Sequence, residues 1–157
     1  MTQQTYAPVL RTVTVDASQE RAFTVFTERF GTWWPQHYSI GGVGMTDFVL
    51  ETKVGGRWYQ VGVDGKERDT GRVTAYEPPE RLTLAWQIDG SWQYDPDPDH
   101  ASEVEVRFIA EGPNRTTVEL EHRGFERHGD GAEAVYNISS PAGWTYLLEQ
   151  FAKKVTA

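Results

Sequence analysis

The chain has 157 residues, of which 38% are hydrophobic and 24% are charged, and its formal net charge is -8. This composition excludes a disordered chain and a membrane-embedded protein, and the length suits one domain with one core. The negative charge and the scattered Lys and Arg residues argue against direct binding of nucleic acid, and the absence of cysteine excludes disulfides and thiolate chemistry.

The sequence predicts neither a signal peptide nor a segment that crosses a membrane. The first ten residues have no basic start followed by an apolar run, and no stretch approaches the ~20 apolar residues that span a bilayer. A cytoplasmic location follows by default. Because no internal repeat or linker interrupts the pattern, we expect residues 1–157 to form a single domain. We also expect the protein to be a monomer.

The N-terminal part predicts one strand and one helix. Alternating valines indicate a strand over residues 7–15, and Ser18 or Asp16 can cap a helix that starts near Gln19. The apolar positions of this helix are Ala22, Phe23, Phe26 and Phe30. Gly31 and Pro35 bracket its end, and the glycine-rich stretch that follows reads as a loop.

From Asp47 onward the hydrophobic period changes to two, which is typical of strands. The alternation predicts strands over residues 48–53, 57–63, 67–76, 82–89, 103–110 and 116–122. Gly55-Gly56 and Asp64-Gly65 predict hairpin turns, because glycine reaches positive φ without steric cost. The stretch 90–100 contains three Asp and two Pro residues in succession and predicts a loop at the rim of the sheet.

The chain ends in a predicted amphipathic helix that starts near Ser140 and Pro141, a plausible cap and first-turn pair. Its apolar stripe consists of Trp144, Leu147, Leu148, Phe151 and Val155. A strand, a helical segment, about six consecutive antiparallel strands and a long helix define an α+β fold. The sheet cannot bury its inner face on itself, so the helix should cover it, and a curved sheet closed over one helix commonly leaves an internal cavity.

Six strings in this order resemble the AHSA1-like branch of the SRPBCC superfamily, which is also called START/Bet v 1. They cover residues 15–23, 55–59, 71–79, 81–86, 118–122 and 143–151. The resemblance implies a helix-grip fold, in which a curved antiparallel sheet wraps around a long C-terminal helix. It also implies a hydrophobic cavity that binds an apolar small molecule.

Four segments look like a narrower group within this branch, the self-resistance proteins of enediyne gene clusters: residues 33–35, 56–59, 95–97 and 121–125. That resemblance implies a protein that binds an enediyne antibiotic and is itself attacked by the activated drug. A glycine α-hydrogen can be abstracted by a bound diradical, because the flanking amides stabilise the backbone radical. Gly90, at the end of a strand beside Trp86 and Trp92, is the candidate sacrificial glycine.

His122 ends an inward series that is otherwise apolar, so it either donates a hydrogen bond within the core or faces a ligand. Trp86 and Trp144 point inward by periodicity, and their rings could form one wall of a cavity or pack in the core. The full set of candidate ligand-binding residues is Trp33, Trp34, Tyr38, Tyr59, Trp86, Trp92, Tyr94, His122, Phe125, Tyr136 and Trp144.

Aromatic residues at the two predicted rims suggest an entrance. Trp33, Trp34 and Tyr38 follow the first helix, where we expect them to be exposed and able to gate an opening under the sheet. Trp92 and Tyr94 on the acidic loop would form the opposite lip. The four histidines lack metal-binding spacing, so we expect no metal and no cofactor.

Three functions remain open. The first is self-resistance to an enediyne-type antibiotic by sequestration or self-sacrifice, with an apolar small molecule as partner and no catalytic turnover. The second is a protein-binding module that activates a chaperone ATPase, which the family name implies. The third is a START-like polyketide cyclase or dehydratase with His122 and Tyr59 as acid and base, because such sites are assembled from separate strands.

Overall fold

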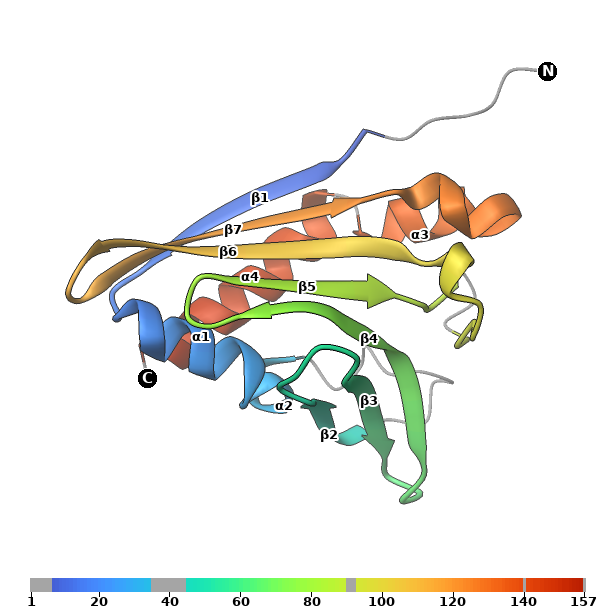
Figure 1. Ribbon diagram of the computed structural model, residues 1–157, viewed down its shortest axis with the longest axis horizontal. Coiled ribbons are helices and arrows are strands. Elements are labelled where there is room, and N and C mark those ends of the chain that lie inside the picture. Colours follow the sequence, from blue (N-terminus) through green and yellow to red (C-terminus); the bar gives the residue numbers. More distant parts are fainter. Residues whose placement is uncertain (1–6, 35–44, 90–92, 140, 157) are drawn as a thin grey trace.

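The computed structural model describes residues 7–34, 45–89, 93–139 and 141–156 (Figure 1). Within these residues, seven strands form one antiparallel sheet in the order β1-β7-β6-β5-β4-β3-β2. The strands are β1 (Val9–Val15), β2 (Met45–Leu50), β3 (Arg57–Gly62), β4 (Glu67–Glu77), β5 (Arg81–Trp86), β6 (Ser102–Gly112) and β7 (Arg115–Arg123). The helices are α1 (Gln19–Thr27), α2 (Phe30–Trp33), α3 (Ala132–Ser139) and α4 (Pro141–Val155), with 3₁₀ helices η2 (Pro98–His100) and η3 (Phe125–Gly131).

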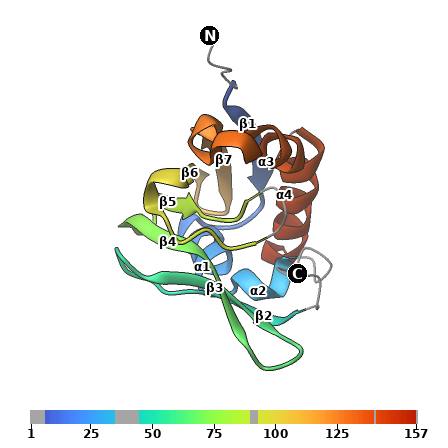
Figure 2. The same cartoon turned by 90° about the vertical axis from the view of Figure 1, so that its right-hand side faces the viewer.

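The sheet curls around helix α4, as the sequence predicts. Strand β1 pairs with β7 at one edge, and the five strands from β2 to β6 follow one another through the sheet to β7. Figure 2 shows α4 on one side of the curled sheet, with α1 and α2 beneath it at the end near β2. The α+β helix-grip architecture is therefore confirmed.

The first helical region is two helices rather than one. Ser18 caps α1 as predicted, since its hydroxyl oxygen accepts a hydrogen bond from the Arg21 backbone N–H at 3.2 Å. Helix α1 ends at Thr27, and Arg29 has the non-helical angles φ -116° and ψ 30°. The chain therefore changes direction before α2, and the aromatic residues of α2 turn toward the core.

The two glycine turns are confirmed. Gly55 has φ +81° and Gly65 has φ +80°, a left-handed conformation that L side chains rarely adopt. The sheet also contains a bulge that the pattern does not predict: Trp58 pairs with Gly71 and Tyr59 pairs with Asp69, so Thr70 has no partner in the register.

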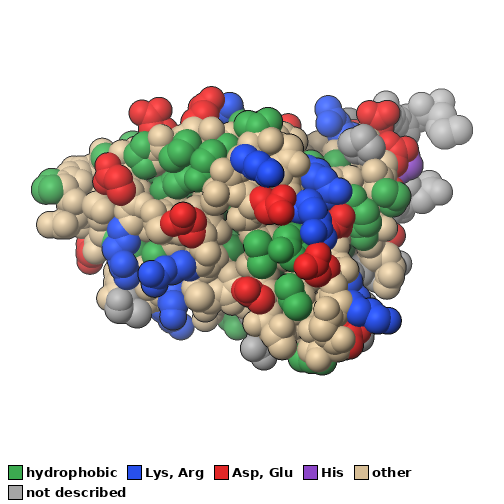
Figure 3. Space-filling model, turned by 60° about the horizontal axis from the view of Figure 1, so that its bottom comes forward, with side chains coloured by type: hydrophobic (Ala, Val, Ile, Leu, Met, Phe, Trp, Pro, Cys, Tyr) green, Lys and Arg blue, Asp and Glu red, His purple; other side chains and the backbone are tan. Residues whose placement is uncertain are grey.

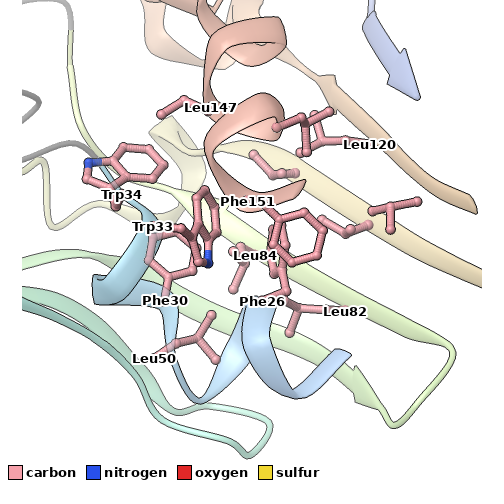
Figure 4. Close-up of a cluster of buried hydrophobic side chains, with 14 of the residues drawn as sticks. Phe26, Phe30, Trp33, Trp34, Leu50, Leu82, Leu84, Leu120, Leu147 and Phe151 are labelled. Carbon is pink, nitrogen blue, oxygen red and sulfur yellow. The ribbon is translucent and has the colours of Figure 1, made fainter. Parts of the chain in front are cut away.

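The stripe of α4 faces inward, and all five of its predicted apolar residues are buried. In Figure 4, Phe151 extends from α4 toward Phe26 and Trp33. Its ring centroid lies 5.3 Å from that of Phe26 and 5.6 Å from that of Trp33. This one side chain therefore joins three helices over the sheet. Ser140, the predicted cap, lies outside the described residues.

The opposite face of the sheet carries rows of ion pairs. Glu105 accepts hydrogen bonds from Arg81 at 2.8 Å, Arg123 at 2.9 Å and Arg107 at 3.1 Å. At the other end of the sheet, Arg57 contacts Asp69 at 2.8 Å. In the face shown in Figure 3, Lys and Arg side chains lie next to Asp and Glu side chains. The curled sheet therefore has one charged face and one aromatic face.

Candidate functional site: a buried aromatic and histidine cluster

A continuous array of aromatic rings fills the concave side of the sheet. Trp58 on β3 lies 5.7 Å from Trp86 on β5, and Trp86 lies 6.1 Å from Trp144 on α4, as measured between ring centroids. Trp34, which follows α2, lies 6.3 Å from Trp144 and completes the connection between the helices. These rings are buried, so aromatic surface forms part of the contact that holds α4 on the sheet.

Gly71 on β4 permits the close approach of two of these tryptophans. In the register it lies between Trp58 on β3 and Trp86 on β5. A Cβ at this position would lie 1.8 Å from the Ala85 carbonyl oxygen and 3.5 Å from the Trp58 ring. Because any side chain would clash there, glycine is required for the two rings to meet across β4.

His122 on β7 is the polar centre of this aromatic interior, with 0% of its surface exposed. The indole N–H of Trp144 donates to Nδ1 of His122 at 3.1 Å. Nε2 of His122 lies 2.7 Å from the hydroxyl of Ser102, the first residue of β6. Burial lowers the pKa of His122 well below its ordinary value, because the charged imidazolium would lose its hydration.

These contacts determine the tautomer of His122. Nδ1 faces a donor, so it must be the acceptor, and the single ring proton then resides on Nε2 and is donated to Ser102. The Ser102 hydroxyl lies 2.7 Å from Nε2 of His128 in η3 and can donate to it. A directional chain of hydrogen bonds therefore runs from Trp144 through His122 and Ser102 to His128.

His128 lies at the half-buried end of this chain. Its pKa is lowered, chiefly by burial, and the charges of Asp95 and Asp89 oppose that effect. His122 also contacts the ring of Phe125 at 4.4 Å, and Phe125 contacts Tyr136 at 5.1 Å. The site therefore combines flat apolar walls with a neutral imidazole whose two nitrogens are both hydrogen-bonded.

The predicted exposure of Trp33 and Trp34 is wrong. Each is only 4% exposed, and both pack on the ring of Phe30, at 4.5 Å and 5.3 Å respectively. The break between α1 and α2 turns these residues inward, which a single continuous helix would not do. Tyr38, expected beside them at the opening, lies outside the described residues.

Tyr59 is not brought together with His122, so the predicted acid–base pair is wrong. Strand alternation buries Trp58 and Gln60 and places Tyr59 on the charged face, where the Arg57 guanidinium lies 4.1 Å from its ring centroid. Trp58 therefore occupies the inward position next to Trp86.

The acidic loop is described only in part. Tyr94 is half-buried against the core and forms an isolated bridge with Ile88. Trp86 donates its indole N–H to the Ile88 carbonyl at 2.9 Å, so this stretch is tied to the aromatic array. Gly90 and Trp92 lie outside the described residues, and the sacrificial role of Gly90 stays a prediction.

Sequence reasoning missed three residues of the site: Trp58, Ser102 and His128. Trp58 could have been found, because it alternates with Arg57 and Tyr59 and so belongs to the inward face. Ser102 and His128 carried no such signal, since they meet His122 only through the pairing of β6 with β7 and the turn into η3.

A pocket of about 250 Å³ lies on the surface where β6 begins and β7 ends. It is lined by Glu103, Arg123, Gly124, Glu126 and Arg127. None of the helices in the described ranges has the length and apolar character needed to cross a membrane. The described side chains also include no group of three or more His, Asp or Glu residues placed to hold a metal ion.

A curled antiparallel sheet that grips a C-terminal helix over an aromatic interior defines the Bet v 1-like class of α+β proteins. Residues 16–156 match the family model described as "Activator of Hsp90 ATPase homolog 1-like protein". The chain belongs to this AHSA1 family, as its motifs predict.

Two similar solved structures carry a functional name. The anthrahydroquino-γ-pyrone synthase Txn09 is 39% identical, with a TM-score of 0.69 over 98% of this chain and 99% of that one. The self-sacrificing resistance protein CalC from Micromonospora echinospora is 33% identical, with a TM-score of 0.68 over 94% of this chain and 93% of that one.

A third solved structure, protein MLL2253 from Mesorhizobium loti, is 19% identical, with a TM-score of 0.66 over 94% of this chain and 95% of that one. This likeness shows the fold alone. A comparison with curated protein sequences gives no significant match.

Proposed function

We propose that this chain binds a flat, apolar natural product against the buried aromatic array and thereby provides self-resistance to an enediyne-type antibiotic. The observation that carries the proposal is the unbroken contact of Trp58, Trp86 and Trp144 across the inner side of the sheet. Stacking on such rings contributes roughly 0.5–1.5 kcal/mol per pair beyond the burial of apolar area. The similarity to CalC supports the choice of ligand class.

The ligand must separate side chains when it binds. The rings of the array lie in mutual contact, with centroids 4.4 Å to 6.3 Å apart. A guest between Trp86 and Trp144 would replace one aromatic contact with two, one on each of its faces. Binding should therefore change the environment of several tryptophans.

The hydrogen bonds of His122 favour binding over turnover. Both ring nitrogens are engaged by protein groups, Nδ1 by Trp144 and Nε2 by Ser102. A ligand reaches His122 only if it displaces one of these partners. An apolar ligand does not compete for these hydrogen bonds, so it can bind without displacing Trp144 or Ser102, and this suits sequestration.

Exposure of the protein to a reductively activated enediyne tests the proposal. We expect protection of plasmid DNA from cleavage and, in the self-sacrifice version, one specific backbone cut detectable by mass spectrometry. Gly90→Ala should abolish that cut, whereas Gly112→Ala, which has open space around it, serves as the matched control. An intact chain together with unprotected DNA would contradict self-resistance.

A second candidate function is polyketide cyclisation. Two observations favour it: the similarity to Txn09, and the hydrogen bonds that connect His122 through Ser102 to His128. His122 would be the acid–base residue without Tyr59, taking a proton at Nδ1 after a substrate displaces Trp144. Turnover of an aromatic polyketide by the wild type and its loss in His122→Gln would support this function.

The family's name also implies activation of a chaperone ATPase, the remaining function open from the sequence. Stimulation of Hsp90 ATPase activity by the purified protein would favour it over both small-molecule functions. A flat ATPase rate, together with retained ligand binding, would leave the small-molecule proposals in place.

A further inference from the structure

The tryptophans of the aromatic array differ in what their indole N–H groups do. Trp86 donates to the Ile88 carbonyl at 2.9 Å, and Trp144 donates to His122 at 3.1 Å. Nε1 of Trp33 and Nε1 of Trp58, by contrast, are buried without a hydrogen-bond partner in the described structure. The hydroxyl of Thr70 is in the same condition.

Such groups are rare because they have lost water and gained nothing in return. Trp58 is 0% exposed, Thr70 is 2% exposed and Trp33 is 4% exposed, so solvent does not satisfy them at the surface. A buried unpaired group in a native protein calls for an explanation, and a bound ligand that supplies the missing partner is one.

These three groups belong to one region. Trp58 pairs with Gly71, and Thr70 immediately precedes Gly71 in the bulge of β4. The Phe30 ring lies 5.5 Å from Trp58 and 4.5 Å from Trp33. The hydroxyl of Thr83 also lacks a hydrogen-bond partner in the described structure. Thr83 lies opposite Glu105 in the β5–β6 register, so its side chain is on the charged face of the sheet.

We propose that the ligand of the aromatic array carries neutral oxygen acceptors on a planar ring system, as quinones and pyrones do, and that Trp58, Thr70 and Trp33 donate hydrogen bonds to them. This inference rests on the proposed small-molecule binding. An indole N–H is a donor only, so the complementary ligand atom must be an acceptor. A pure hydrocarbon would leave all three groups unpaired.

The acceptor should be neutral rather than a carboxylate. Among the described residues, the ring contacts of Trp58 are Phe30, Phe48 and Trp86, all of them uncharged. A carboxylate placed among such rings would be desolvated without a cation to compensate it. A ketone oxygen costs less to bury and still accepts an indole N–H.

Two probes with the same three-ring skeleton test this proposal: anthracene, which has no acceptor, and 9,10-anthraquinone, which has two carbonyl oxygens. Equilibrium dialysis with detection of the probe by its absorbance gives both dissociation constants. We expect anthraquinone to bind at least ~10-fold more tightly than anthracene relative to their partition into octanol, since each buried hydrogen bond adds a factor of about 5 to 10.

Substitutions then assign the donors. Trp58→Phe keeps an aromatic ring and removes the N–H, so anthraquinone binding should weaken by about 5- to 10-fold while anthracene binding changes little. Thr70→Val is the variant least able to perturb folding, because the hydroxyl it removes has no partner. It should weaken anthraquinone binding by about 3- to 10-fold, and Thr83→Val, on the charged face, should change neither probe.

The outcomes separate two failures. Equal normalised affinities for the two probes, or variants that weaken both probes alike, would overturn the donor role while leaving small-molecule binding standing. Binding of neither probe would count against the proposed function itself.

Discussion

At the scale of the residue, His122 shows how a polar group is kept in an aromatic interior. Its two nitrogens have one donor and one acceptor partner, so the neutral ring is fully satisfied. Protonation would put a second donor opposite the Trp144 N–H and break that match. Burial is the main cause that lowers the pKa of His122, and the nearby His128 adds to it. The hydrogen bond from Trp144 to Nδ1 also requires the neutral ring.

This arrangement makes stability depend on pH. In the unfolded chain His122 protonates below about pH 6.5, whereas in the folded protein it stays neutral, so the unfolded state binds more protons as the pH falls. We expect the free energy of unfolding to decrease below pH 6.5, with a contribution from His122 of up to about 1.4 kcal/mol per pH unit. Urea unfolding at pH 7.5, 6.5, 5.5 and 5.0 measures this slope.

His122→Gln should reduce the slope, while the part due to His128 remains, since the pKa of His128 is also lowered. His100→Gln is the opposite control. The hydrogen bond that His100 donates to the Asp95 carboxylate raises the pKa of His100. His100 therefore stabilises the fold as the pH falls, and its loss should steepen the decline. An unchanged slope in His122→Gln would show that His122 is not neutral in the folded protein.

Local periodicity decided which residues the sequence could correctly place on the inner face. His122, Trp86 and Trp144 were correctly placed inward because alternation and helical spacing decide the facing of regular elements. Tyr59 was chosen from a motif without the same test, and its neighbour Trp58 holds the inward position. Partners that come from distant segments, such as Ser102 and His128, have no local signature.

At the scale of the element, the strands were predictable and the irregular joints were not. Alternation recovers all seven strands to within a few residues, because one face of the sheet is buried and the other is charged. The break at Arg29 and the helices η3 and α3 were missed. These features depend on how apolar residues pack in the core. The helices are also too short to show a clear helical period in the sequence.

A substitution in strand β4 tests how tightly β4 and β5 pack together. Gly71→Ala would place a methyl group 1.8 Å from the Ala85 carbonyl oxygen, so the β4–β5 pair must shift and the contact of Trp58 with Trp86 must loosen. We expect a loss of at least about 2–3 kcal/mol in the free energy of unfolding.

The matched control for that substitution is Gly112→Ala in β6, because nothing lies within 4 Å of a Cβ added there. This variant should stay within about 0.5 kcal/mol of the wild type. Chemical denaturation of the two variants compares them directly, and similar values would mean that β4 and β5 tolerate separation.

A substitution in strand β6 tests how much the ion pairs of the charged face contribute to stability. The hydrogen bond from Arg81 is the largest cause that lowers the pKa of Glu105, and Arg123 and Arg107 add to it. A lowered carboxyl pKa contributes stability that is present above about pH 4.5 and is lost as the pH falls through the folded pKa. Glu105→Gln should therefore cost about 2 kcal/mol at pH 7 and much less at pH 3.

Glu119→Gln is the control for the Glu105 variant. Its side chain is 40% exposed and its contact with Arg107 is 3.4 Å long, so the change should cost no more than about 0.5 kcal/mol. Thermal unfolding at both pH values measures the difference. A penalty for Glu105→Gln that persisted at pH 3 would locate its origin in packing rather than in charge.

At the scale of the whole molecule, the sequence predicts the closure of the sheet over one helix but not how the space between them is filled. The order of elements and the apolar stripe on α4 were enough to predict closure, since the sheet must bury its inner face and the stripe offers a long apolar surface for it. The ring contacts between α2, β3, β5 and α4 depend on tertiary packing. The oxygen acceptors proposed for the ligand therefore rest on the unpaired polar atoms of that packing, which no sequence motif reveals.

The predicted single domain implies that sheet and helices unfold together. Phe151 is fully buried and contacts Phe26 of α1 and Trp33 of α2, so it links α4 to the rest of the core. Phe151→Ala should cost about 3–5 kcal/mol and lower the melting temperature by about 10 °C or more. Because α4 covers the sheet's apolar face, far-UV and near-UV circular dichroism should follow one shared transition in the wild type and in the variant. A variant in which helical signal is lost first, while the sheet melts at the wild-type temperature, would show that α4 is a separate unit and that the grip on the helix does not stabilise the sheet.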